Sequence, residues 1–179
     1  MSTKLSTLLP EAASAATERL PYGRQTIGED DIEAVVEVLR SDWLTTGPAV
    51  DGFESAVAAF TGARHAVAVS SGTAALHAAM YALGIQRGDE VIVPPMTFAA
   101  TANAVVYCGG TPVFADVQPG SLLLDPACVE SKITPCTRAI VPVDYAGQPC
   151  DYDELRALAD HRGVALVADA CHAIGATYR

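Results

Sequence analysis

The sequence predicts an α/β fold in which one layered domain is built on a mostly parallel sheet with helices on both faces. Five short runs rich in valine and alanine are too short for helices and alternate with helix-like stretches. These runs are residues 66–69, 91–93, 112–115, 139–143 and 165–168. Strands that alternate with helices form βαβ units, and such units cover both faces of a parallel sheet. The chain has 179 residues, half of them hydrophobic, which is enough for one domain with a real core.

The region before this alternation has a different character. Residues 1–20 are rich in Ala, Ser and Thr and predict a flexible leader. Residues 29–40 carry an apolar stripe at helical spacing, and Asp30 or Asp31 is expected to cap the start of that helix. The Gly-Pro pair at positions 47 and 48 predicts a loop over residues 41–48.

The remaining helices follow from apolar spacing and from their end signals. Asp125 followed by Pro126 is typical of a helix start, because proline suits the first helical turn. A glycine at position 62 is expected to end the helix before it. The expected helices cover residues 51–60, 73–83, 98–107, 127–133 and 152–161.

Composition excludes several classes of function. The 21 acidic and 11 basic residues give a net charge of -10, whereas phosphate backbones require clustered Lys and Arg, so no nucleic-acid partner is expected. No apolar run approaches the roughly 18 residues of a membrane span, and the N-terminus lacks the apolar block of a signal peptide. We therefore expect a soluble, cytoplasmic protein.

Metal and disulfide chemistry is not expected either. The five cysteines include no CxxC pair, and in a cytosolic chain they are expected to be small buried hydrophobes. His65 and His77 have no second ligand at metal-binding spacing, so no metal site is predicted.

In open α/β sheets ligands bind beyond the carboxyl ends of the strands, so the residues after each run are the candidates. Gly72 and Thr73 follow the first run and open a helix. Unpaired amides at a helix start attract anions, and the absence of a Cβ lets the Gly72 backbone approach one closely. Simple N-capping by Ser71 or Thr73 explains the same residues. The Walker and GxGxxG patterns are absent.

Three further candidates follow later runs. Asp169 ends the last run, where a buried carboxylate would need a partner such as a cationic heterocyclic nitrogen. His172 follows it closely, and Phe98 opens the helix after the second run, where it could stack on a ring. A capping Asp, a structural His and a core Phe are the alternatives. No GxSxG elbow is present to anchor a hydrolase triad.

Over residues 20–179, segments of the chain resemble the sequence blocks of the DegT/StrS-type sugar aminotransferases in their order and spacing. The segments are PYGRQ, SDWLTTGP, ARHAVAVSSGTAALHAA, GDEVIVPPMTFAATANAV, GGTPVFADV, RAIVPVDYAGQPCDYDEL and LVADACHAIGA. The resemblance implies the large-domain fold of type I aminotransferases and the cofactor pyridoxal 5'-phosphate (PLP). Within the family, the chain looks most similar to transaminases of UDP-linked amino sugars.

The resemblance also implies roles for five residues. Gly72 and Thr73 look like the phosphate-binding turn, and Phe98 looks like the aromatic that stacks on the pyridine ring. Asp169 and His172 look like catalytic residues, Asp169 as the carboxylate facing the ring nitrogen and His172 as the residue beside the ring face or the phenolic oxygen. A homodimer would then transfer an amino group from L-glutamate to C4 of a UDP-linked 4-keto-6-deoxy-N-acetyl sugar, a step toward pseudaminic acid.

The Schiff-base lysine of the family has no counterpart in this chain. The two lysines are Lys4, in the leader, and Lys132, and neither matches the family motif. We therefore expect residues 21–179 to be the N-terminal part of the PLP-binding large domain, with its C-terminal part absent. The alternatives are a related sugar dehydratase with His in place of the lysine, or a non-catalytic orphan half. A nucleotide-binding α/β domain is a third alternative, though it lacks both glycine fingerprints.

Overall fold

The computed structural model describes residues 24–179 of the chain. The predicted leader, residues 1–20, and Lys4 lie outside the described residues. The chain divides into two units, Met1–Ala49 and Val50–Arg179, and each is described by itself. Among the helices within residues 24–179, none has both the length and the apolar character that crossing a bilayer requires.

The described part of the first unit contains helix α1 (Glu29–Arg40), which has the predicted bounds. Its N-cap is Gly28, so the prediction that Asp30 or Asp31 occupies this position is wrong. Asp31 nevertheless stabilises the first turn, because its Oδ2 accepts a hydrogen bond from the Gly28 N–H at 2.8 Å. A carboxylate in this turn also interacts favourably with the positive end of the helix dipole.

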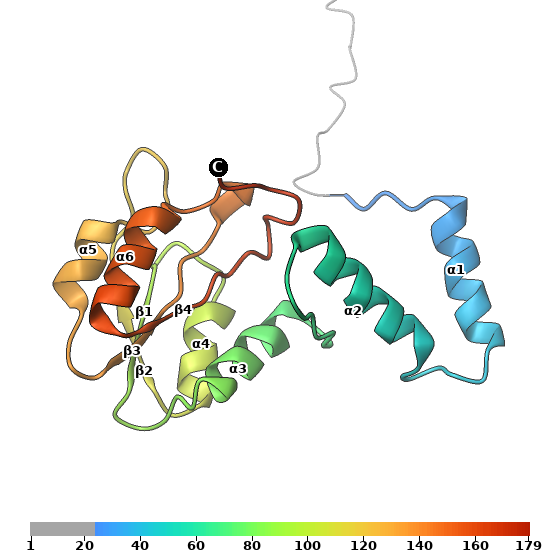
Figure 1. The fold of residues 1–179 in the computed structure, drawn as a ribbon, viewed down its shortest axis with the longest axis horizontal. Helices are drawn as coiled ribbons and strands as arrows, with labels where there is room; N and C mark the ends of the chain where they lie inside the picture. The colour runs from blue at the N-terminus through green and yellow to red at the C-terminus, as the bar shows by residue number, and fades with distance from the viewer. Residues whose placement is uncertain (1–23) are drawn as a thin grey trace, which may run out of the picture. The chain divides into compact units, whose positions relative to one another are not determined.

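The second unit is built on a four-stranded parallel sheet with the strand order β2-β1-β3-β4 (Figure 1). Its strands are β1 (Glu90–Val93), β2 (Thr111–Phe114), β3 (Thr137–Ile140) and β4 (Ala165–Leu166). The inner strands are β1 and β3, and Val91 of β1 lies between Pro112 of β2 and Ala139 of β3. Four of the five predicted strands and the parallel α/β class are therefore confirmed.

The first predicted strand, residues 66–69, is not a strand of this sheet. Its backbone has no ladder partner among residues 24–179, and Val67 is 79% exposed. The Ala68 N–H instead donates to Glu54 Oε1 at 2.7 Å, from helix α2 (Pro48–Thr61). The apolar pattern identifies a segment suited to extended backbone, but a strand also requires a neighbouring strand to accept its hydrogen bonds.

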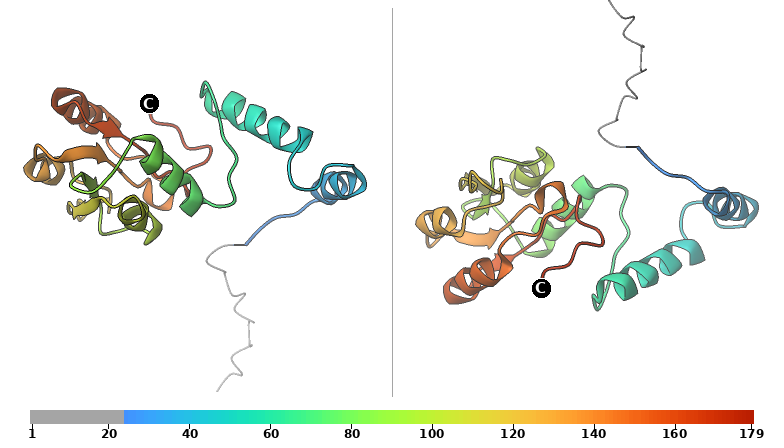
Figure 2. Two further views of the ribbon diagram at one scale, coloured as in Figure 1. Left: turned by 90° about the horizontal axis from the view of Figure 1, so that it is seen from below. Right: turned by 90° about the horizontal axis from the view of Figure 1, so that it is seen from above.

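Helices cover both faces of the sheet, as Figure 2 shows from two sides. The four helices are α3 (Gly72–Ala82), α4 (Ala100–Tyr107), α5 (Pro126–Lys132) and α6 (Tyr152–Arg162). In β1, the side chains of Val91 and Val93 contact the cluster formed with α3 and α4, whereas Ile92 contacts the cluster formed with α5 and α6. All three are fully buried. Because successive side chains of a strand point to opposite faces, β1 contributes to a hydrophobic core on each side of the sheet. This is the arrangement of a sheet between two helix layers that the sequence predicts.

Local end signals set the helix bounds to within a few residues of the prediction. Ser71 caps α3 by accepting from the Ala74 N–H at 3.1 Å, and Asp125 caps α5 through the Ala127 N–H at 2.9 Å. Helix α6 ends at Arg162 and is followed by the C-cap Gly163, whose φ of 66° lies in the left-handed region.

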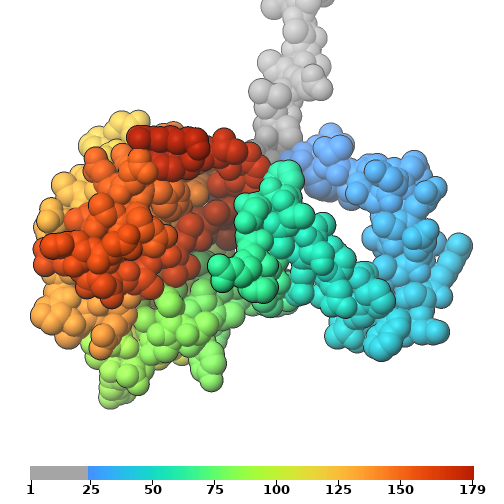
Figure 3. Space-filling model, viewed as in Figure 1, coloured from blue at the N-terminus to red at the C-terminus, as the bar shows by residue number. Residues whose placement is uncertain are grey.

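After β4 the chain runs along the surface of the second unit (Figure 3, dark red). Its last residues are tied to the start of α6: the Tyr178 hydroxyl donates to Asp151 Oδ1 at 3.0 Å, and Arg179 pairs with Asp153 at 2.7 Å.

Candidate functional site

The candidate site lies where the strand order reverses. From β1 the chain moves first to β2 on one side, and then returns to β3 and β4 on the other. Ligands of open α/β sheets bind at such switch points, beyond the carboxyl ends of the strands. The segments that follow β1, β3 and β4 are therefore the relevant ones, and they carry Phe98, Asp144 and Asp169.

Asp169 is buried, with 6% of its surface exposed. Its Oδ2 accepts a hydrogen bond from Thr101 Oγ1 at 2.7 Å, and its Oδ1 accepts a longer one from the Cys171 N–H at 3.4 Å. The backbone N–H of Asp144 donates to the Asp169 carbonyl oxygen at 3.0 Å, which fixes the turn after β4 against the turn after β3. Among the ion pairs of residues 24–179, none involves Asp169. The carboxylate therefore has neutral donors and no cationic partner within the described chain.

The start of α3 approaches the Asp169 turn closely. A Cβ added to Gly72 would lie 3.0 Å from Cys171 Sγ, closer than side chains normally pack. The Ser71 side chain caps the helix, so the alternative that Ser71 in the Ser-Gly-Thr motif is an N-cap residue is confirmed. The cap uses the N–H of Ala74, while the amides of Gly72 and Thr73 have no intrahelical acceptor. The structure therefore brings the predicted anion cradle and the predicted carboxylate to one edge of the sheet.

Phe98 lies just before α4, and its side chain is 77% exposed. Its carbonyl oxygen accepts the Thr101 N–H at 3.1 Å, so its backbone is fixed to the residue that binds Asp169. This exposure contradicts the alternative that Phe98 packs in the core. Stacking on a ligand requires an exposed ring. His172 is also exposed, and its ring centroid lies 6.5 Å from that of Tyr145.

Sequence reasoning missed Thr101. It is 1% exposed, and its hydroxyl lies 2.6 Å from Oγ1 of Thr97, which is in the segment before α4. Two threonines spaced by four residues at the start of an apolar helix are a weak signal on their own, because Thr often bonds its own backbone there. Only the contact with Asp169, 68 positions away, distinguishes Thr101 from a local capping residue.

A second buried carboxylate, Asp144, was also not singled out as a site residue. Its Oδ1 accepts hydrogen bonds from the Tyr152 hydroxyl at 2.8 Å and from the Cys150 N–H at 2.9 Å. Burial, followed by the adjacent Asp144, raises the pKa of Tyr152 far above its ordinary value. Tyr152 is therefore a neutral hydrogen-bond donor at physiological pH. Asp144 thus holds the segment after β3 in place beside Asp169.

The cysteines only partly match the expectation of buried hydrophobes. All five are free thiols, and Cys150 alone is fully buried, within the core beneath α5 and α6. Burial, followed by the charge of Asp144, raises the pKa of the Cys150 thiol to about 12. Cys171 is exposed, and a hydrogen bond to Asp169 is the largest of the effects that raise the pKa of its thiol to about 11. Both groups are therefore protonated at neutral pH.

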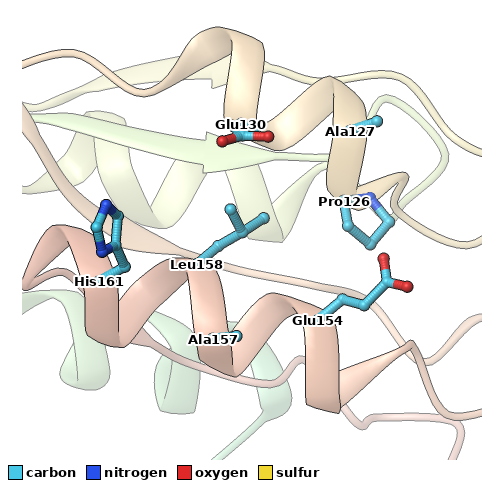
Figure 4. Close-up of a pocket in the computed structure, with 7 residues that line it drawn as sticks. All are labelled: Pro126, Ala127, Glu130, Glu154, Ala157, Leu158 and His161. Carbon is cyan, nitrogen blue, oxygen red and sulfur yellow. The ribbon is translucent and has the colours of Figure 1, made fainter.

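Two of the hollows on the second unit bear on the location of the site. One, of about 440 Å³, lies between α5 and α6, where Leu158 points inward and the rim carries Glu130, Glu154 and His161 (Figure 4). None of the predicted site residues lines it. The other, of about 700 Å³, includes Asp144 and Ala170 in its lining and is adjacent to the Asp169 turn.

Lys132 is far from this edge of the sheet. It is the last residue of α5, it is exposed, and β3 begins five positions later at Thr137. In a βαβ unit the helix returns the chain to the start of the next strand, so Lys132 lies at the opposite edge from Asp169. The topology thus supports the expectation that Lys132 has no part in this site.

Comparison with known proteins supports the predicted resemblance. Residues 25–179 match the DegT/DnrJ/EryC1/StrS aminotransferase family. The chain is 49% identical over 160 residues to the spore coat polysaccharide biosynthesis protein SpsC of Bacillus subtilis, covering 89% of this chain and 41% of that protein. Among solved structures, DesV of S. venezuelae has a TM-score of 0.80 and 45% identity, with 82% of this chain and 40% of that one covered.

The PLP-form of Spr1654 from Streptococcus pneumoniae has a TM-score of 0.83 and 35% identity, with 87% of this chain and 44% of that one covered. The chain thus spans about two fifths of the length of these relatives. Similarity of this extent in both sequence and fold goes beyond a shared architecture. The chain belongs to the DegT/DnrJ/EryC1/StrS aminotransferase family.

Proposed function

We propose that this chain supplies the coenzyme-binding edge of a PLP-dependent sugar aminotransferase. The observation that carries the proposal is the buried carboxylate of Asp169, which has no cationic partner among the described residues and lies beside the open helix start at Gly72. A pyridinium nitrogen is a suitable partner for such a carboxylate, and a phosphate is a suitable ligand for such a helix start. PLP carries both groups, and a relative of this fold is known in a PLP-form.

Each residue then has a task of its own. The amides of Gly72 and Thr73 bind the phosphate, and the exposed ring of Phe98 stacks on the coenzyme and limits its tilt. Asp169 favours the protonated form of the ring nitrogen, because an opposite charge stabilises the ionised state of its neighbour. His172 contacts the coenzyme from the segment after Asp169. The coenzyme, when bound, supplies an electron sink for amino-group transfer.

For the substrate we propose a nucleotide-linked sugar with a ketone at C4. The specific proposal is a UDP-linked 4-keto-6-deoxy-N-acetyl sugar, with L-glutamate as amino donor, in a cytoplasmic homodimer on the route to pseudaminic acid. The name of SpsC supports a surface-polysaccharide sugar in general, since that relative belongs to spore coat polysaccharide biosynthesis. Neither lysine of this chain fits the Schiff-base role, so we expect the chain alone to bind coenzyme without catalysing turnover.

Calorimetric binding of pyridoxamine 5'-phosphate and of pyridoxamine to the full chain tests the coenzyme proposal. We expect the phosphate ester to bind much more tightly, and Asp169→Asn to weaken its binding about tenfold, since a hydrogen bond to a charged group contributes about 1.5–3 kcal/mol. Asp116→Asn is the matched control, because Asp116 follows β2 at the same edge and is exposed. Equal affinities for the two compounds, or an unchanged affinity in Asp169→Asn, would contradict the proposal.

A further inference from the structure

We propose that Thr101 is a positioning residue that holds the carboxylate of Asp169 in the orientation required for binding the coenzyme ring. The inference deepens the proposed function and rests on it. It assigns to Thr101 no contact with substrate or coenzyme, only control of the group that makes the contact. The observation behind it is the hydrogen bond of 2.7 Å from Thr101 Oγ1 to Asp169 Oδ2, which is buried on both sides.

The direction of each hydrogen bond follows from the number of protons available. Thr101 has one hydroxyl proton and two acceptors within reach, Asp169 Oδ2 at 2.7 Å and the Phe98 carbonyl oxygen at 3.2 Å. The shorter bond, to a charged acceptor, is the stronger one, so we assign the proton to Asp169. The Thr97 hydroxyl, 2.6 Å from Thr101 Oγ1, must then be the donor in that pair. Thr97 therefore fixes the rotation of the Thr101 hydroxyl and directs its proton toward the carboxylate. A short chain of donors runs from Thr97 through Thr101 to Asp169.

The same residue is linked to the aromatic side of the site. The Thr101 N–H donates to the Phe98 carbonyl oxygen at 3.1 Å, so Thr101 connects the backbone of Phe98 with the side chain of Asp169. The two residues come from segments that follow β1 and β4. One buried threonine thus sets the position of one coenzyme contact relative to the other.

The bond to Oδ2 is the shortest that the carboxylate accepts within the described chain. The other donors to Asp169 are weaker: the Cys171 N–H, 3.4 Å from Oδ1, and the Cys171 thiol. Without the Thr101 hydroxyl, the carboxylate would lose its shorter hydrogen bond and could rotate about its side-chain bonds. We therefore expect loss of orientation when the hydroxyl is removed, with little change in the fold around it.

The test compares Thr101→Val, which removes the hydroxyl at nearly constant shape, with Thr101→Ser, which keeps it. Thr137→Val is the matched control, because Thr137 is also buried and its hydroxyl oxygen accepts a hydrogen bond from the Thr134 N–H, away from Asp169. Three-bond NMR couplings report the side-chain rotamer of Asp169 in the full chain without any ligand. We expect one rotamer in the wild type, Thr101→Ser and Thr137→Val, and averaging over several in Thr101→Val. If Thr101→Val does not fold, Thr101→Ala takes its place.

Binding of pyridoxamine 5'-phosphate is the second measurement. We expect Thr101→Val to bind about tenfold more weakly than the wild type, with Thr101→Ser within about twofold of it. A single Asp169 rotamer in Thr101→Val, or affinity equal to the wild type, would overturn the positioning role. Failure of the wild type itself to prefer the phosphate ester would instead count against the proposed function, while the rotamer measurement would still decide the role of Thr101.

Discussion

The reactivity of the Cys171 thiol provides a coenzyme-free measurement of its contact with the Asp169 carboxylate. Hydrogen bonding to Asp169, then burial, then the negative charge of Asp169 raise the pKa of Cys171 from 9.0 to about 11. Alkylating reagents attack the thiolate, so Cys171 is expected to react slowly although it is exposed. Asp169→Asn removes the negative charge and leaves only one, neutral acceptor oxygen, so it should make Cys171 react faster.

The size of the effect follows from the two pKa values. At about pH 8, a thiol with the ordinary pKa is about one tenth ionised, whereas a thiol with a pKa of about 11 is about one thousandth ionised, a hundredfold difference. A thiolate of higher pKa is more nucleophilic, with a Brønsted coefficient of about 0.4–0.5, which recovers about tenfold. The net expectation is a rate about tenfold below that of an unperturbed cysteine. In Asp169→Asn the charge is lost and the hydrogen bond to the side chain becomes a weaker, neutral one, so a large part of that factor should be regained.

Alkylation by iodoacetamide at pH 8, followed over time by peptide mass spectrometry, measures each cysteine separately. The reference for Cys171 is its own rate in the chain unfolded in urea. Cys136 is the internal control, since it is exposed, lies just before β3 and should react equally in both proteins. Equal Cys171 rates in the wild type and Asp169→Asn would refute the close contact between the two side chains.

Two further predictions concern stability. Gly110→Ala places a Cβ 2.7 Å from Ile85 Cγ2 and should cost about 1–3 kcal/mol, whereas Gly120→Ala, with no atom within 4 Å, should be near neutral in urea unfolding. A hydrogen bond from Arg138 lowers the pKa of Asp89 in the folded chain below the ordinary value of 3.8. The stability that this ion pair contributes is therefore fully present above pH 3.8, and it is lost as the pH falls through the pKa that Asp89 has in the folded chain. Arg138→Met should therefore lower the urea midpoint at neutral pH, and its effect should shrink in strong acid; an effect independent of pH would contradict the assignment.

Most of the secondary structure could be predicted because its causes are local. Helix α1 begins and ends where the apolar stripe does, and the Asp125–Pro126 signal marks the start of α5 as the structure has it. The alternation along β1 directs neighbouring valine and isoleucine side chains to opposite faces wherever the strand lies in a two-sided sheet. The order of the family's blocks is equally a property of the chain itself, and the comparison with relatives confirms the family.

Long-range contacts decided the rest. Residues 66–69 have a strand-like composition and still form no ladder with the described residues, because pairing depends on a partner and not on the segment. Thr101 looks like an ordinary helix residue until the fold brings it within 2.7 Å of a carboxylate 68 positions away. The sequence by itself determined which segments are helical or extended and which residues are candidates for chemistry. Only the tertiary structure decided which candidates meet, because burial and hydrogen-bond partners are properties of the folded arrangement and no local pattern encodes them.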